Sequence, residues 1–388
     1  MYNVQLEEFC KAYNLGEIVE SKLFPIGMAN RTYLVETKTD KYVIKAINPT
    51  KVRTPKKIKR LEIAEQIAEI ASRNGVSSIV VIRINGKIIT EFLGQHYIVF
   101  KFFDGEVIHL NKLTQQHCFK AGKLLATLHS TKFTGISRRD IPKCNYGKKP
   151  NGNIDWDTYY QEIAKIAPKW LSLLEENLSL LNTMFELSYE IHLNFIPADK
   201  VISHGDVSNL NMMWKDGIPY FLDWETSGYI DATYECLYAA IRFSSEKDPE
   251  NNQKRILNME KIFSFFEGYI EKRALKFENL NTALYMIYYK RLSILQRHFQ
   301  KYIEATKDSE RKHSERVIIP FLGLLKSFED LEGQLEMMKD KVKYFQMKKE
   351  IKENFVREIK QEIKNEILEE LSQEQKGKFS FKSLFRTK

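Results

Sequence analysis

The sequence of 388 residues predicts an α+β protein with a small antiparallel-sheet lobe, a larger helical lobe and a long charged helix at its C-terminus. Short runs rich in β-branched and aromatic residues, separated by turn signals, fill the first hundred residues. Longer segments with apolar residues at helical spacing follow, and the spacing between charges changes again after about residue 320. The expected units are therefore residues 1–103, 104–326 and 327–388.

The composition supports a soluble protein with a substantial core and argues against membrane, secreted and nucleic-acid-binding proteins. Hydrophobic residues make up 43% of the chain, and no run of eighteen apolar residues predicts a membrane span. The N-terminus carries acids where a signal peptide would carry bases, and the four cysteines are scattered, so we expect reduced thiols in a cytoplasmic protein. The net charge of +9 comes with no nucleic-acid-binding motif, so no nucleic-acid partner is expected.

The first strands carry a lysine in an unusual place. Residues 23–35 are typical of a strand, a turn and a second strand, and residues 41–47 form another strand after a polar turn. Lys45 lies within the apolar part of that strand, where an ammonium group is costly unless it finds an anion. The alternative is a lysine on the solvent face of an edge strand.

A helix follows over residues 56–74 and ends at Gly75, a typical C-terminal glycine. Three glutamates on this helix could pair with Lys45. Glu65 is favoured by its distance from Gly75, and Glu62 comes second.

The remaining strands of the small lobe lie between residues 79 and 103. Residues 79–84 and 87–93 predict a hairpin turned at Asn85-Gly86, a strong type I′ signal. Residues 97–103 form a long apolar run that predicts a central strand leading out of the lobe.

The segment from His204 to Asp223 carries the chemistry. Asp206 can accept or orient the proton of a hydroxyl, while Asn211 and Asp223 offer hard oxygen ligands for Mg²⁺. The apolar strand that delivers Asp223 follows a turn at residues 215–217, Lys-Asp-Gly. The pattern H-x-D-x-x-x-x-N, then a strand ending in Asp, is typical of protein-kinase-like phosphoryl transfer. The alternative is a polar loop between strands that holds acids by chance.

In their order along the chain, these parts resemble the aminoglycoside phosphotransferase and choline kinase superfamily, over roughly residues 20 to 300. The similar motifs are the loop Gly27-x-x-Asn30-x-Thr-Tyr33, the lysine strand Tyr42-Val-Ile-Lys45, the helix motif Leu125-Ala-Thr-Leu-His129, the catalytic loop His204-Gly-Asp206 with Asn211, and the metal motif Asp223-Trp-Glu225. Glu235 stands where the family more often has Asp.

The resemblance implies a bilobal protein-kinase-like fold and an enzyme that uses ATP and Mg²⁺. It implies that Asp206 is the catalytic base, that His204 supports the loop, and that Asn211 and Asp223 hold the metal. Lys45 would bind the ATP phosphates.

The other nucleotide contacts are also implied by the resemblance. Glu65 would pair with the lysine, Asn30 would belong to the loop over the nucleotide, and the backbone from Phe100 to Phe102 would contact adenine.

The acceptor is expected to be a small molecule with a hydroxyl group, such as an aminoglycoside, a choline-like amino alcohol or a sugar. A G-x-G-x-x-G loop, an A-P-E motif and an evident activation segment are missing, which disfavours a protein substrate. Asp155, Asp157 and Glu235 could hold a polyamine, whereas Trp156, Trp224, Tyr229 and Tyr285 could hold a quaternary ammonium. The sequence leaves this choice open.

The C-terminal unit predicts a charged helix that packs on the large lobe or self-associates. Apolar residues from 328 to 345 keep near-heptad spacing, and those from 351 to 371 step by four, so the second stripe winds around the helix. The basic end, residues 376–388, favours a frayed soluble terminus over weak contact with an anionic membrane surface. A catalytically weak kinase-like scaffold that assembles through this helix is the alternative to an enzyme.

Overall fold

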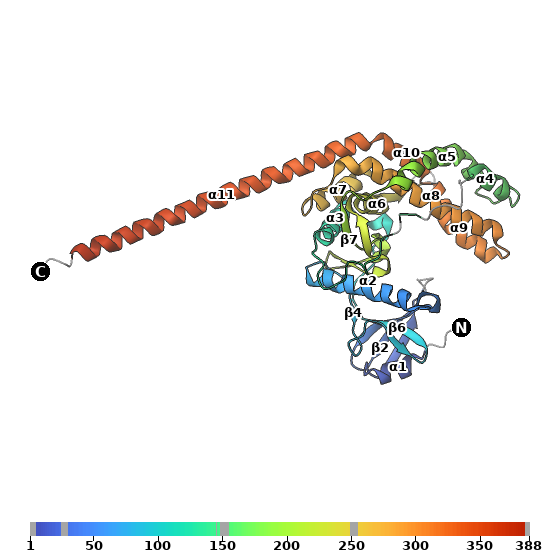
Figure 1. Ribbon diagram of the computed structural model, residues 1–388, viewed down its shortest axis with the longest axis horizontal. Helices are drawn as coiled ribbons and strands as arrows, with labels where there is room; N and C mark the ends of the chain where they lie inside the picture. Colours follow the sequence, from blue (N-terminus) through green and yellow to red (C-terminus); the bar gives the residue numbers. More distant parts are fainter. Residues whose placement is uncertain (1–4, 25–29, 145, 148–154, 249–254, 385–388) are drawn as a thin grey trace.

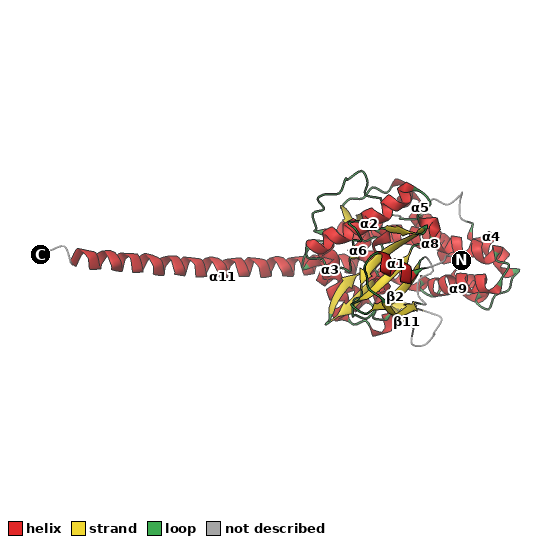
Figure 2. Cartoon of the chain, turned by 90° about the horizontal axis from the view of Figure 1, so that it is seen from below, coloured by secondary structure: helices red, strands yellow, loops and turns green. Residues whose placement is uncertain are grey.

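The computed structural model describes residues 5–24, 30–144, 146–147, 155–248 and 255–384, with side chains up to residue 368. It confirms the predicted fold class: a small antiparallel-sheet lobe joins a larger, mainly helical lobe, and the long C-terminal helix projects away from the large lobe (Figure 1). Figure 2 shows the same long helix projecting well clear of the rest of the chain.

The small lobe is built on one antiparallel sheet of six strands, ordered β1-β2-β3-β6-β4 with β5 also paired to β6. Its strands are β1 (Ile18–Leu23), β2 (Arg31–Thr37), β3 (Lys41–Ala46), β4 (Val81–Ile82), β5 (Thr90–Phe92) and β6 (Gln95–Lys101), and the short helix α1 (Leu6–Ala12) precedes them. Lys45 lies on β3, between β2 and β6, so the sheet holds its backbone from both sides.

Helix α2 (Pro55–Arg73) lies between the sheet and the helical lobe (Figure 1). Thr54 caps its N-terminus by accepting a hydrogen bond from the Lys57 amide, and proline occupies the first turn. The predicted end is confirmed, because Asn74 is the C-cap and Gly75 follows with φ +86°.

The predicted hairpin of residues 79–93 is correct only at its turn. Asn85 and Gly86 have φ values of +49° and +78°, and Ile84 pairs with Lys87 on either side of them. Beyond that pair, however, β4 and β5 pair with β6 and not with each other. β6 is the longest of these three strands and also pairs with β3, so it lies inside the sheet and offers each flanking segment more buried contact than a two-stranded ribbon could.

The large lobe contains eight α-helices and three short two-stranded sheets among the described residues. Its helices are α3 (Gln115–His129), α4 (Trp156–Ala164), α5 (Leu171–Asn194), α6 (Ala232–Ser244), α7 (Met259–Ile270), α8 (Leu280–Glu304), α9 (Asp308–Leu322) and α10 (Leu325–Gly333). The strand pairs are β7 (Lys200–Ser203) with β10 (Gly228–Asp231), β8 (Met212–Lys215) with β9 (Ile218–Phe221), and β11 (Ser245–Lys247) with β12 (Arg255–Leu257). The turn predicted before the metal motif is confirmed, because Asp216 and Gly217 join β8 to β9 with φ values of +52° and +69°.

Helices α3 and α7 approach closely enough that their backbones touch through two glycines. A Cβ atom built on Gly122 would lie 2.0 Å from the Phe265 carbonyl oxygen, and one on Gly268 would lie 1.9 Å from that of Phe119. These distances are far inside van der Waals contact, so both helices depend on glycine for their packing.

We expect Gly268→Ala to lower the free energy of unfolding by about 1–3 kcal/mol, because the new methyl group pushes against a backbone carbonyl that cannot rotate away. Gly333→Ala is the matched control, since nothing lies within 4 Å of its added Cβ. The control should be neutral or stabilising by up to about 1 kcal/mol. Urea denaturation of both variants measures the difference, and equal stability of the two would contradict the close helix contact.

The C-terminal helix α11 (Leu335–Leu384) has two parts. Its first two turns complete the large core, where Leu335, Met338 and Val342 are buried. Beyond Lys348, which pairs with Glu267 of α7, the described side chains are largely exposed. The predicted packing on the lobe is therefore confirmed for this first part, whereas self-association stays a prediction.

The basic terminus is described only as helical backbone up to Leu384, so the prediction of membrane-surface contact lies on side chains outside the described part. Within the described residues, no helix is both long and apolar enough to cross a membrane.

Candidate active site

The predicted catalytic loop leaves β7 and turns sharply at Gly205, which has φ +79°. A Cβ atom on Gly205 would lie 2.5 Å from the Thr226 carbonyl oxygen, so only glycine fits this turn. The Thr226 hydroxyl donates a 2.9 Å hydrogen bond to the His204 carbonyl. The loop and the segment after Asp223 are thereby held together.

Asp206 is the centre of this loop, and two side chains hold its carboxylate. Asn211 donates its amide to Oδ2 at 2.9 Å and to the Asp206 carbonyl at 2.8 Å, while Arg242 of α6 forms an ion pair with Oδ1. Burial acts to raise the pKa of Asp206, but the charge and hydrogen bond of Arg242 outweigh it, and the pKa falls below its ordinary value. Asp206 is therefore ionised near neutral pH and can accept a proton.

Arg242 was missed in the sequence. Its only local signal is that it stands alone as a cation in α6, a helix whose other residues are all buried. A lone arginine in such a helix needs an anion nearby, but the sequence of the helix does not identify that anion.

His204, a predicted support of the loop, is buried at the start of the loop. It is fully buried, its Nε2 donates a 2.9 Å hydrogen bond to the Leu222 carbonyl, and its ring lies against Phe221 and Trp224. Because Leu222 immediately precedes Asp223, this hydrogen bond links the catalytic loop to the metal motif.

A buried polar network lies beneath the loop. Glu235 accepts a 2.7 Å hydrogen bond from the Gly205 amide through Oε1 and lies 2.9 Å from His129 Nε2 through Oε2. His129 Nδ1 lies 2.8 Å from the Tyr269 hydroxyl. Burial acts to raise the pKa of Glu235, yet the hydrogen bond and charge of His129 lower it overall. This network fixes the position of the loop from below, so Glu235 and His129 are positioning residues.

Asp223 has left-handed backbone angles, φ +63° and ψ +66°, which few residues other than glycine adopt. Its Oδ1 lies 3.2 Å from Lys45 Nζ, so the two lobes meet at this ion pair. Strain of this kind is usual where a side chain must point into a functional site.

Asn211 and Asp223 fit the predicted magnesium ligands in their donor chemistry. Asn211 uses its amide nitrogen on Asp206, and among the described residues no hydrogen bond engages its side-chain oxygen. No described cluster of three His, Cys, Asp or Glu side chains could hold a metal. A pair of oxygen ligands suits Mg²⁺, which commonly keeps several waters and binds substrate phosphates.

Lys45 and Glu65 lie close enough to influence each other, although no ion pair between them is within 4.0 Å among the described contacts. Burial lowers the pKa of Lys45, but Asp223, Glu65 and Glu225 raise it overall. Burial raises the pKa of Glu65 to about 8, and its Oε2 has no hydrogen-bond partner in the described structure. Glu69 pairs with Arg83, and the charge of Glu62 also acts on Arg83, whereas the charge of Glu65 acts on Lys45. Of the three candidates, Glu65 is therefore the one whose contact with the lysine is supported.

Asn30 contacts the metal-motif segment. It donates a 2.6 Å hydrogen bond to Glu225 and accepts a 3.1 Å bond from the Asn48 amide, and Glu225 also pairs with Lys51. Nothing in the sequence indicated that Lys51 would contact this segment. The loop residues 25–29, which the resemblance places over a nucleotide, lie outside the described part, so the role of Asn30 stays a prediction.

The predicted adenine contact lies where β6 leaves the sheet. The Phe100 ring is 5.3 Å from Lys45 Nζ, and the Phe102 amide donates a 2.9 Å hydrogen bond to the Lys41 carbonyl. Since the sheet already uses that amide, an adenine contact at Phe102 would need its carbonyl oxygen. Glu106 then pairs with Trp214 of β8, which joins the linker to the large lobe.

The acids and aromatics proposed for a cationic acceptor have other partners. Asp155 caps α4 through the Thr158 amide, and Glu235 lies in the buried network. Trp156 and Trp224 are core residues, and the Tyr285 hydroxyl donates to Glu332. Their structural partners account for these groups without an acceptor, and the choice of acceptor stays open.

A two-lobed fold with an interlobe lysine, a loop aspartate and an Asn–Asp pair defines a kinase-like phosphotransferase. Residues 20–256 match the phosphotransferase enzyme family denoted APH, which is more than half of the chain, and the chain belongs to this family. The resemblance drawn from the motifs is thereby confirmed. No curated protein matches the sequence.

Solved structures share the fold at low sequence identity. Spectinomycin phosphotransferase, APH(9)-Ia, in complex with ADP and spectinomycin is 15% identical with a TM-score of 0.62, over 84% of this chain and 98% of that chain. Amicoumacin kinase hAmiN with AMP-PNP and Ca²⁺ is 15% identical with a TM-score of 0.58, over 85% and 97%. A microcompartment-associated aminopropanol kinase is 14% identical with a TM-score of 0.53, over 85% and 99%.

Proposed function

We propose that this protein transfers the γ-phosphoryl group of ATP to a hydroxyl of a small molecule in a Mg²⁺-dependent reaction. The observation that carries the proposal is the meeting of Lys45 and Asp223 across the lobes, 3.2 Å apart, beside a loop in which Asn211 and Arg242 hold Asp206. Family membership and structures of relatives with bound nucleotides support it.

Each side chain has a role in this proposal. Asp206 accepts the proton of the acceptor hydroxyl as its oxygen attacks phosphorus, and Lys45 neutralises phosphate charge while the ADP leaves. Asn211 and Asp223 would hold Mg²⁺, which supplies charge neutralisation at the phosphates. His204, Glu235 and Arg242 keep the loop in place.

The proposal is tested by following ADP release and labelled product when the full-length protein meets ATP, Mg²⁺ and a panel of hydroxyl compounds. The panel holds aminoglycosides, amino alcohols, sugars and their acidic derivatives. We expect transfer to at least one acceptor, stopped by EDTA and by Lys45→Met. Nucleotide binding without transfer to any acceptor would refute the enzyme assignment.

The second candidate function is a catalytically weak scaffold that assembles through α11. The observation that favours it is the exposed apolar face of this helix, where Ile351, Phe355 and Ile363 are each at least 50% exposed. The acceptor panel separates the two candidates, because a scaffold binds nucleotide without turnover. An apolar helix face is also compatible with an active enzyme that self-associates.

A further inference from the structure

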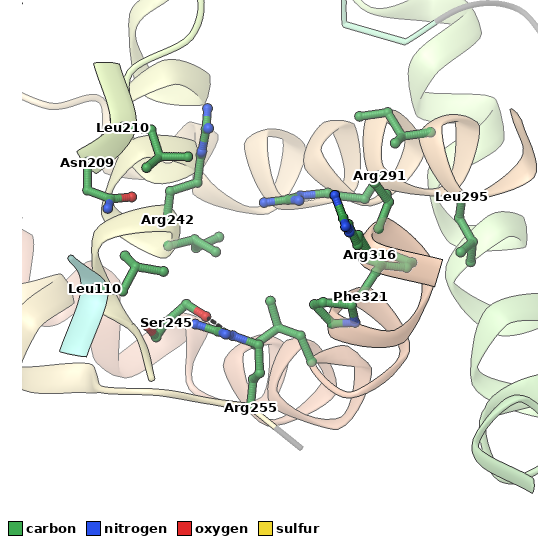
Figure 3. A pocket seen from close by; sticks show the side chains of 15 residues that line it. Leu110, Asn209, Leu210, Arg242, Ser245, Arg255, Arg291, Leu295, Arg316 and Phe321 are labelled. Atoms are coloured by element: carbon green, nitrogen blue, oxygen red, sulfur yellow. Dashed lines mark hydrogen bonds between the residues drawn. The ribbon is translucent and has the colours of Figure 1, made fainter. Parts of the chain in front are cut away.

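A cavity of about 420 Å³ opens in the large lobe directly beside the catalytic loop. Asn209 and Leu210, which lie between Asp206 and Asn211, form one side of it, and α6, α8, α9 and the β11–β12 pair form the others (Figure 3). Its volume lies in the range that small ligands occupy. Its place next to Asp206 makes it the natural position for the acceptor.

Four arginines line this cavity: Arg242, Arg255, Arg291 and Arg316. No acidic residue is among the described residues that line it. In Figure 3 the four side chains come from four different elements, and those of Arg291 and Arg316 reach into the space between them. A pocket for a polyamine or a quaternary ammonium would show the opposite charge pattern.

Three of these arginines have no carboxylate partner among the residues that the structure describes. Arg242 pairs with Asp206, whereas within the described part of the chain no carboxylate lies within 4.0 Å of a guanidinium nitrogen of Arg255, Arg291 or Arg316. Among the described residues, Arg255 donates to the hydroxyl and the carbonyl of Ser245, and burial lowers its pKa. Arg255 and Arg291 are partly buried, and Arg316 is exposed beside them. A cation kept partly out of water without an anion is unfavourable, so a bound anion would stabilise Arg255 and Arg291, and Arg316 adds to the positive charge around it.

The aromatic ring beside the cavity experiences the same positive field. The Tyr238 ring centroid lies 4.9 Å from Lys290 Nζ, 5.1 Å from the Arg291 guanidinium carbon and 5.6 Å from that of Arg242. Burial acts to raise the pKa of Tyr238, but these three cations outweigh it and lower the pKa. The cations of α6 and α8 therefore extend the basic surface from the cavity to Asp206.

We propose that this cavity is the acceptor subsite and that the acceptor carries a phosphate or carboxylate group in addition to the hydroxyl that is phosphorylated. The inference rests on the proposed phosphotransferase function and specifies its substrate class. Guanidinium groups bind both anions through paired, charge-assisted hydrogen bonds. The acceptor hydroxyl would then lie near Asp206, lose its proton to that carboxylate and form the new O–P bond as the bond to ADP breaks.

The first experiment compares acceptors that differ in charge alone: a sugar, its phosphomonoester, its uronic acid and its amino sugar. We expect kcat/KM with the better of the two anionic acceptors to exceed that with the amino sugar by at least about a hundredfold, since like charge in a partly buried site is strongly unfavourable. The phosphomonoester and the uronic acid distinguish the two anions. Faster transfer to the neutral or amino sugar would overturn the inference and leave the phosphotransferase function intact.

The second experiment removes single charges from the cavity. Arg255→Gln and Arg316→Gln should each raise the KM for the anionic acceptor by about tenfold or more, because each removes a charge-assisted hydrogen bond. The loss should be smaller with a neutral acceptor and smaller for kcat than for KM. Arg357→Gln, on the exposed part of α11, is the matched control. Equal KM values in the cavity variants and the control would overturn the inference.

The third experiment does not depend on turnover. Isothermal titration of the full-length protein with inorganic phosphate and with malonate, in the presence of AMP-PNP and Mg²⁺, should show binding that weakens in Arg255→Gln and Arg316→Gln and persists in Arg357→Gln. Absence of anion binding by the unmodified protein would refute the subsite. Anion binding without transfer to any acceptor would instead count against the proposed function.

Discussion

Asp206→Asn is expected to reduce kcat by about 10²–10⁴-fold, because the amide keeps the size of the carboxylate but cannot take the proton of the acceptor. Arg242 loses its anionic partner in this variant, whereas Asn211 can still donate to the new amide oxygen. In the proposed site the nucleotide binds on the Lys45 side of Asp223, so its affinity should change by no more than a few-fold. Initial rates and a nucleotide titration measure the two effects separately.

Asp216→Asn is the matched control for this substitution. Asp216 lies at the exposed turn between β8 and β9 with φ +52°, a conformation that asparagine also adopts. The control should keep the rate of the unmodified protein. If Asp206→Asn retained a comparable rate, Asp206 would not be the catalytic base.

Glu235→Ala is expected to lower the free energy of unfolding by about 3–5 kcal/mol, since removal of one member of a buried pair leaves the other without its partner. The side chains of Glu235 and His129 are 2% and 0% exposed, so water cannot replace the lost contacts. The Gly205 amide also loses its acceptor, and the loop that carries Asp206 should become less well positioned. Urea denaturation gives the stability, and kcat at saturating acceptor gives the second effect.

Two further variants separate the buried network from a general loss of charge. Glu235→Gln keeps an oxygen for the Gly205 amide and should lose clearly less stability than the alanine variant. Glu186→Ala on the exposed face of α5 should change stability by no more than about 0.5 kcal/mol. A Glu235→Ala protein as stable as the Glu186→Ala protein would show that the network contributes little.

The geometry of the segment from His204 to Asp223 was predictable because it is local. His204, Asp206, Asn211 and Asp223 lie within twenty residues, and one loop and one hairpin bring them together. The turn at residues 215–217 and the glycine at position 205 are determined by backbone conformations that favour particular residue types. Sequence spacing therefore carried most of the information about this half of the site.

The strand pairing of residues 79–93 and the nature of the acceptor site were harder to predict from the sequence. The Asn85-Gly86 turn specifies its own backbone but not the strand with which each flanking segment pairs, and β6 competes successfully for both. For the acceptor, the acids and aromatics noted in the sequence proved to have structural partners. The sequence contains residue types that could bind a cation, but the contacts that each side chain makes depend on the surrounding fold.

The sequence by itself determined the order of the elements, the catalytic loop, the metal motif and the lysine strand, because each depends on residues close together along the chain. Only the tertiary structure decided that Arg242 pairs with Asp206, that Glu235 supports Gly205, and that arginines from four elements line one cavity. These contacts join segments far apart in the sequence, and the packing of the helices sets their distances. The interactions between their charges become strong only where packing limits access to water.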